Sequence, residues 1–286
     1  MVGDPPDPSL DPPLEPYEWL MPLAPWESPE VLAEVLTSLA AQTWPARRLV
    51  VSVDGSLPEP LRQVLTAGGL PLCILEAPDW QGTGAVLARG LAACSTRWVL
   101  RSDADDCSHP QRAERQLRHL ARHPQLVVLG CQLGERLAEG RRVGVRSVPG
   151  AAAAIRARLR WRNPFNHPTV ALSRPAVLAA GNYRPCPGFE DWDLWLRLAA
   201  AGADFANLPD DLVTAAVGAA HLARRRGGAY AQREATFLCR CGREGLLPWA
   251  QVLLLLLLRL PLRLLPPAWL AAVMRCLRST RGAGTE

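Results

Sequence analysis

The stretch WVLRSDADD at residues 98–106 decides the fold, because it joins an apolar run to an acidic cluster. Trp98–Leu100 has the composition of a short buried β-strand, and Asp103, Asp105 and Asp106 follow it closely. Carboxylates this near one another repel unless a cation lies between them, and Mg²⁺ and Mn²⁺ are hard ions that take oxygen ligands. The cluster therefore predicts a divalent-metal site. A solvated acidic turn or a helix cap is the alternative interpretation.

Strand-like and helix-like segments alternate on both sides of this stretch. The helix-like segments are Pro29–Ala41, Pro58–Ala67, Ala85–Ala93, Pro110–His123 and Asp191–Ala201, and the strand-like runs are Leu49–Val53, Leu72–Leu75, Trp98–Leu100, Leu126–Leu129 and Thr169–Leu172. This alternation predicts an α/β fold with a mostly parallel, Rossmann-like sheet flanked by helices. Ligands of such sheets bind beyond the carboxyl ends of the strands. Asp54 and Asp103–Asp106 both follow strands, so we expect them to face one crevice.

Three regions of different composition divide the chain. Residues 1–17 are rich in proline and acidic side chains, which cannot build a packed core, so they are predicted to be a disordered leader. Residues 18–215 contain the alternating segments and are predicted to be the main folded domain. Residues 216–286 are predicted to form a helical C-terminal tail.

The tail carries a leucine-rich stretch whose environment the sequence leaves open. Val252–Leu258 is wholly apolar, but Arg259, Pro261 and Arg263 interrupt it well before the ~20 residues that span a bilayer. Leucine and tryptophan beside arginine are typical of a helix lying in a membrane surface, so residues 246–277 are a candidate for peripheral membrane contact. A helix that covers the core or binds a partner has the same pattern.

The formal net charge of +5 comes from 32 basic residues, all of them arginine, and 27 acidic residues. Residues 221–286 hold eleven arginines against three glutamates, whereas the leader is acidic. This distribution suits an anionic surface for the tail and does not predict nucleic-acid binding. The N-terminus lacks the features of a signal peptide, and the eight cysteines lack zinc spacing, so we expect a cytoplasmic protein.

Three further polar motifs are ordinary when each is taken alone. Asp54-Gly55-Ser56 is a turn signal, the histidine of Asn166-His167-Pro168-Thr169 suits a structural hydrogen bond, and Glu190-Asp191 suits a helix N-terminus. Taken in order with the acidic cluster, they resemble the family 2 glycosyltransferases of the GT-A fold. The resemblance extends from about Leu20 to Leu212. The matching segments are LTSLAAQTWP (36–45), VSVDGS (51–56), RGLAA (89–93), DADD (103–106), HPTV (167–170), AGNYR (180–184) and FEDWDLWLR (189–197).

The resemblance implies that residues 18–215 are the catalytic domain of a bacterial glycosyltransferase of the hexosyltransferase type, active in cell-surface polysaccharide synthesis. The donor would be a nucleotide-sugar, usually a UDP-sugar, and the transfer would invert the anomeric centre. Asp54 and Pro22 would bind the donor nucleotide, with Asp54 on the base. Asp103 and Asp105 would contact the ribose and the diphosphate.

The same resemblance assigns the metal and the acceptor side. Asp105 and Asp106 would hold Mn²⁺ or Mg²⁺. Asp191 would be the general base that takes a proton from the acceptor hydroxyl, and Glu190 would help to place the acceptor. The acceptor would be a saccharide, a lipid-linked sugar or a protein. Peripheral contact with the inner face of the membrane is predicted from the composition of the tail, which the resemblance does not cover.

Departures from the family pattern keep two alternatives open. The segment Met21–Trp26 keeps Pro22 but lacks the family's Tyr-Asn pair, and Ala88 stands where the family has an asparagine. A degenerate member that binds nucleotide-sugar or a partner without catalysis is the first alternative. A nucleotidyltransferase is the second, although Pro22–Ser28 offers no glycine-rich phosphate loop.

Overall fold

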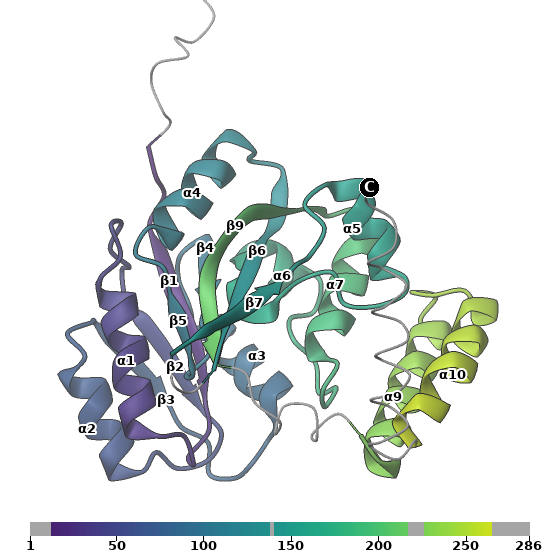
Figure 1. The fold of residues 1–286 in the computed structure, drawn as a ribbon, viewed down its shortest axis with the longest axis horizontal. Helices are drawn as coiled ribbons and strands as arrows, with labels where there is room; N and C mark the ends of the chain where they lie inside the picture. Colours follow the sequence, from purple (N-terminus) through teal and green to yellow (C-terminus); the bar gives the residue numbers. More distant parts are fainter. Residues whose placement is uncertain (1–12, 138–139, 217–225, 265–286) are drawn as a thin grey trace, which may run out of the picture. The chain divides into compact units, whose positions relative to one another are not determined.

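Within residues 13–137, 140–216 and 226–264, which the computed structural model describes, the chain forms parts of two compact units, Met1–Val217 and Gly218–Glu286 (Figure 1). A nine-stranded sheet organises the described part of the first unit. In spatial order its strands are β3 (Leu72–Leu75), β2 (Leu49–Val53), β1 (Tyr17–Leu23), β4 (Trp98–Arg101), β8 (Ala171–Ser173), β6 (Leu126–Arg136), β9 (Asp204–Ala216) and β5 (Asp106–Ser108), and β7 (Arg142–Arg146) pairs with β6. The strands from β3 to β4 are all parallel, as are β6 and β9, while β5, β7 and β8 pair antiparallel. The predicted α/β fold is confirmed.

Helices cover both faces of the parallel strands. They are α1 (Pro29–Ala40), α2 (Glu59–Ala67), α3 (Thr83–Ala93), α4 (Arg112–Arg122), α5 (Ala152–Leu159), α6 (Arg174–Ala179) and α7 (Glu190–Ala200). Side chains alternate along β1, so Trp19 and Met21 share one core cluster with α1, α2 and α4. Leu20 lies on the other face, where its Cδ1 atom fills the space that a Cβ atom at Gly90 of α3 would need.

The helix ends follow the expected capping chemistry. Ser28 accepts a hydrogen bond from the Val31 N–H (3.3 Å), and Pro29 occupies the first helical position of α1. Gly202 follows α7 with a φ of +84°, a conformation that side chains disfavour.

Three boundaries in the structure differ clearly from the predicted ones. Tyr17, which the sequence assigned to the leader, is instead the fully buried first residue of β1. The strand expected at Leu126–Leu129 continues to Arg136, because it pairs along its length with β9. The run Thr169–Leu172 begins with a 3₁₀ turn at His167–Thr169, so β8 starts only at Ala171. Residues 1–12 of the predicted leader lie outside the described residues.

The described part of the second unit is a pair of helices, α9 (Gly228–Arg243) and α10 (Trp249–Leu264). Glu234 of α9 is fully buried, and Arg259 and Arg263 of α10 form ion pairs of 2.6 and 2.7 Å with it. Six leucines of α10 are exposed: Leu253, Leu254, Leu257, Leu258, Leu262 and Leu264. Of the candidate membrane-contact segment, residues 265–277 lie outside the described residues. No described helix combines the length and apolar character that crossing a bilayer requires.

Candidate active site

The predicted donor-binding residues follow neighbouring parallel strands. β1 lies between β2 and β4, with Pro22 paired to Ser52 and Leu20 paired to Arg101. Asp54 therefore follows β2 on one side of the end of β1, and Asp103 follows β4 on the other side. The carboxyl ends of these strands form one edge of the sheet, which is where ligands of such sheets bind.

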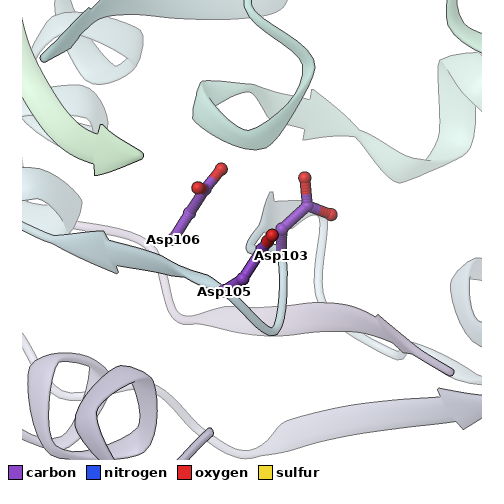
Figure 2. A group of neighbouring side chains, drawn as sticks. All are labelled: Asp103, Asp105 and Asp106. Atoms are coloured by element: carbon purple, nitrogen blue, oxygen red, sulfur yellow. The ribbon is translucent and has the colours of Figure 1, made fainter. Parts of the chain in front are cut away.

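The acidic cluster after β4 brings three carboxyl groups together. Oxygens of Asp103, Asp105 and Asp106 all lie within 4.8 Å of one another, and Figure 2 shows the three side chains around the turn between β4 and β5. Asp106 is buried, and its burial together with the charges of Asp103 and Asp105 raises its pKa well above the ordinary value. A set of close carboxylate oxygens suits the hard ions Mg²⁺ and Mn²⁺, because a divalent charge would relieve this repulsion.

A buried arginine lies beside the cluster. Arg101 donates from both terminal nitrogens to the two carboxylate oxygens of Asp103, one contact at 3.0 Å. Arg112 holds the backbone of Arg101 in place. Its fully buried guanidinium donates to the Arg101 carbonyl (2.7 Å) and to the Ser108 hydroxyl (3.0 Å). Burial lowers the pKa of Arg112 to about 10, so it remains charged at neutral pH. Two cations thus fix the turn that carries the acidic side chains.

The predicted base lies at the first turn of α7. Asp191 Oδ1 accepts the N–H of Trp192 (2.6 Å), and Oδ2 accepts the Asn163 side-chain amide. His167 Nδ1 lies 3.8 Å from the same Oδ2 atom, and its Nε2 atom is 3.0 Å from the Tyr183 hydroxyl. The Asp191 side chain keeps 19% of its surface exposed, so it is oriented by its neighbours yet reachable by an acceptor.

Burial and charge shift the titration of the groups around Asp191. Burial, with the negative charge of Asp191, raises the pKa of Glu190 to about 7, and its Oε2 atom is buried without a hydrogen-bond partner. Burial, with the positive charge of Arg101, holds the pKa of His167 well below its ordinary value, so this imidazole is neutral at pH 7. Arg101 also lowers the pKa of Glu190. Its charge therefore acts on both the acidic cluster and the groups at α7.

An ion-pair network holds the start of α7 in place. Asp193 is fully buried and pairs with Arg184 (2.8 Å) and Arg197 (2.9 Å). Segment 182–184 also contacts α3, because Asn182 donates to the Ala88 carbonyl (2.9 Å). At Gly84 a Cβ atom would lie 2.4 Å from the Arg184 carbonyl oxygen, so only glycine allows this approach. Segment 182–184 thus joins α3 to α7.

Asp54 fixes the loop that leads into α3. Its Oδ1 and Oδ2 atoms accept the N–H groups of Gln81 (2.6 Å) and Gly82 (3.0 Å). Each carboxylate oxygen has a further lone pair, so a contact with a nucleotide base is still compatible with this geometry.

The structure brings the predicted residues into two groups: Pro22, Asp54 and the acidic cluster along the strand ends, and Glu190 with Asp191 at α7. Sequence reasoning missed Arg101, Asn163 and Tyr183. A signal for Arg101 was present, since an arginine that follows the apolar run Trp98–Leu100 has to find a buried partner. The contacts of Asn163 and Tyr183 depend on tertiary structure and had no local signal.

Comparison with known proteins identifies the family of this chain. The family model described as glycosyl transferase family 2 matches residues 26–180, more than half of the chain. An uncharacterized glycosyltransferase of Haemophilus influenzae is 38% identical over 263 residues, which cover 89% of this chain and 96% of that protein. The chain belongs to glycosyltransferase family 2.

Other relatives have more specific names. The amylovoran biosynthesis glycosyltransferase AmsE of Erwinia amylovora is 36% identical over 73% of this chain and 79% of its own. The UDP-Gal:alpha-D-GlcNAc-diphosphoundecaprenol beta-1,3-galactosyltransferase of Escherichia coli is 27% identical over 85% of this chain and 89% of its own. Among solved structures, the mannosyltransferase PcManGT of Pyrobaculum calidifontis, in complex with GDP-Man and Mn²⁺, superimposes with a TM-score of 0.62 at 18% identity, covering 96% of this chain and 77% of its own. This likeness confirms the predicted GT-A fold.

Proposed function

We propose that this protein transfers a sugar from a UDP-sugar to an acceptor hydroxyl by a metal-dependent, inverting displacement. The observation that carries the proposal is an acidic cluster whose oxygens lie within 4.8 Å of one another, together with the oriented carboxylate of Asp191. The charge of Arg101 acts on the cluster and on Glu190, the neighbour of Asp191. A metal-diphosphate site and a general base are the two parts that such a displacement requires.

Each residue has a role in the proposed reaction. Pro22, Asp54 and Asp103 lie along the strand ends, where the donor nucleotide would bind. A divalent ion held by Asp105 and Asp106 would supply positive charge to stabilise the departing nucleoside diphosphate. Asn163 and the backbone of residue 192 would keep Asp191 aimed at the acceptor.

The proton transfer can be written from the groups around Asp191. The acceptor hydroxyl becomes more acidic as its oxygen attacks the anomeric carbon, and Asp191 takes its proton. His167 is neutral, so it places no positive charge beside Asp191 that would make this carboxylate a weaker base. One in-line displacement inverts the anomeric centre and requires no covalent nucleophile. Glu190, beside Asp191, would bind an acceptor hydroxyl.

Replacing Asp191 tests the proposed base. Asp191→Asn should lower kcat by about 10²–10⁴-fold, the usual contribution of a general base, while UDP binding is unchanged. Release of UDP from UDP-sugars with Mn²⁺ and candidate acceptors is the assay, and Asp204→Asn, a half-exposed surface residue, is the matched control. Equal turnover of Asp191→Asn and wild type would remove Asp191 from this role. Binding of UDP-sugar by the wild type with no transfer to any acceptor would instead favour the non-catalytic alternative.

The donor and the metal are tested by thermal shift. UDP-, GDP- and TDP-sugars should stabilise the protein in the order of their affinity, because a ligand that binds only the folded state raises Tm. We expect stabilisation by UDP-sugars, dependent on Mn²⁺ or Mg²⁺ and lost in Asp106→Asn. Stabilisation by GDP-sugars alone would contradict the UDP assignment. Stabilisation that persists in a chelator would contradict the metal requirement.

We further propose that the acceptor is a lipid-linked sugar and that α10 contacts the inner face of the membrane. The exposed leucines of α10 support this proposal, since exposed apolar surface on a basic segment is typical of peripheral membrane helices. Residues 226–264 hold six arginines against two glutamates, which would favour anionic lipids. A relative whose name gives a diphosphoundecaprenol acceptor supports the same assignment.

Vesicle sedimentation tests this contact. The protein should bind vesicles that contain anionic lipid, and the double variant Leu254→Gln, Leu257→Gln should bind them several-fold less. Val143→Gln with Val145→Gln, which changes exposed residues of β7, is the control. Equal binding by both variants, or none by the wild type, would remove α10 from the proposal and leave the chemistry of the first unit untouched.

A further inference from the structure

Two tryptophans stack on each other at the surface of the first unit. Trp26 follows β1 and Trp80 precedes α3, and their ring centroids lie 4.8 Å apart with an interplanar angle of 24°. Trp26 is 66% exposed and Trp80 is 59% exposed. Tryptophan has the largest apolar surface of any side chain. Exposing a stacked pair to water is therefore unfavourable in free energy unless a ligand covers the pair.

The second tryptophan is held in place by its neighbours in the chain. Gln81 and Gly82, which follow Trp80, both donate their N–H groups to Asp54. Gly82 has a φ of +83°, a backbone conformation that only glycine adopts readily. Arg89 of α3 donates to the Gln81 side chain (3.0 Å) and to the Ser52 hydroxyl (3.2 Å). The loop that carries Trp80 is therefore tied to the end of β2.

The first tryptophan belongs to the same edge of the sheet. The N–H of Asp54 donates to the carbonyl of Leu23, the last residue of β1, and Trp26 lies three residues further along the chain. The stacked pair therefore stands beside Asp54, at the β2 side of the strand ends. The acidic cluster lies on the β4 side of the same edge. A ligand with its diphosphate at the acidic cluster would extend its other end toward the tryptophans.

We propose that the Trp26–Trp80 stack is the platform on which the donor's nucleobase binds, and that Asp54 positions this platform. This inference rests on the proposed function and deepens it. The flat face of an indole stacks on any nucleobase, which supplies affinity with little dependence on base identity. Asp54 would then act through the Trp80 loop as a positioning residue, in addition to any contact of its own with the base.

Calorimetry with two probes tests the platform. Mn²⁺-UDP carries the base, and Mn²⁺-pyrophosphate lacks it. Trp26→Ala and Trp80→Ala should each weaken Mn²⁺-UDP binding about tenfold or more, the size of one lost stacking contact, and should leave Mn²⁺-pyrophosphate binding unchanged. Trp249→Ala, which removes an exposed tryptophan of α10, is the matched control and should bind UDP as the wild type does.

Circular dichroism provides a second measurement that does not depend on activity. Two stacked indoles give an exciton couplet, which should vanish in Trp26→Phe and in Trp80→Phe while the helical signal stays. Asp54→Asn should weaken the couplet as well as UDP binding, because it loosens the loop. A couplet of full size in Asp54→Asn would limit Asp54 to direct contact and overturn its positioning role.

The outcomes separate this inference from the proposed function. If the wild type binds Mn²⁺-UDP and both alanine variants bind it equally well, the platform is refuted and the proposed function stands. If the alanine variants bind UDP normally but lose affinity for acceptor saccharides, the stack serves the acceptor, which also refutes the platform. If the wild type binds no nucleoside diphosphate, the proposed function itself fails.

Discussion

Replacing Glu190 with glutamine should stabilise the protein at alkaline pH. Burial and the charge of Asp191 raise the pKa of Glu190 from the ordinary 4.5 to about 7. A carboxyl whose pKa is higher in the folded state holds its proton there while the unfolded chain has already released it. The free energy of unfolding therefore falls as the pH rises from 4.5 to 7, and the loss is complete above pH 7.

The size of the effect follows from the same shift. Each pH unit between the two pKa values contributes about 1.4 kcal/mol, so the interval from 4.5 to 7 corresponds to a ceiling of about 3 kcal/mol. Glu190 is only half-buried as a whole, and solvent screening reduces the figure to about 1–2 kcal/mol. Glutamine keeps the shape of the side chain and removes the charge. Glu190→Gln should match the wild type at pH 4.5 and exceed it by this amount at pH 8.

Urea unfolding at several pH values, in a buffer with chelator so that no divalent ion neutralises the site, measures this difference. Glu59→Gln, an exposed residue of α2, is the control and should differ from the wild type by less than about 0.5 kcal/mol at every pH. A stability difference between Glu190→Gln and wild type that does not grow between pH 5 and pH 8 would refute the reasoning. Loss of activity at the same time would show a residue kept for function at the expense of stability.

Three further variants test the packing around the site. Arg101→Met should lose about 1.5–3 kcal/mol in urea unfolding, because it removes charge-assisted hydrogen bonds to a carboxylate, and a loss below 0.5 kcal/mol would contradict the role given to this side chain. Asp193→Asn should lose about 3 kcal/mol, because it removes the buried carboxylate with which Arg184 and Arg197 are paired. Asp210→Asn, which breaks a surface pair, should lose less than about 1 kcal/mol, and equal losses would argue against the network. Gly90→Ala should lower Tm by several degrees, because the new Cβ atom would lie 2.4 Å from Leu20 Cδ1, and an unchanged Tm would mean that the sheet and α3 separate easily.

β2, β3 and β4 of the parallel set were predictable because they are apolar, and the helices between them because they are periodic. β1 was not among the predicted strands, since Glu18 and Pro22 interrupt its apolar run. β9 was not predictable. It contains Asn207, Pro209 and two consecutive aspartates, which disfavour a strand. It forms because β6 pairs with it over its whole length, and the register shifts between Cys131 and Gln132, where Pro209 and Asp210 of β9 are passed over. Pairing between distant segments thus overrode local propensity.

In the candidate site too, some features were predictable from local sequence and others depend on contacts between distant segments. The carboxylates were predictable, because their order along the chain and their places after strands or at a helix start are local facts. Their partners were not. Asn163 contacts a residue 28 positions away, and Tyr183 contacts His167 across two elements. His167 was taken for a structural residue, and only the folded chain places it 3.8 Å from Asp191.

Segment 182–184 links α3, at the donor side of the proposed site, to α7, which carries Asp191. Asn182 and the backbone of Arg184 contact α3 at Ala88 and Gly84, and the side chain of Arg184 is paired with Asp193 of α7. A donor that shifts the N-terminal end of α3 would therefore move the helix that carries Asp191 with it. Two binding events joined in this way influence each other equally, so an acceptor should bind more tightly to the donor-loaded enzyme than to the empty one. The donor should likewise bind more tightly when the acceptor is already bound, by the same factor.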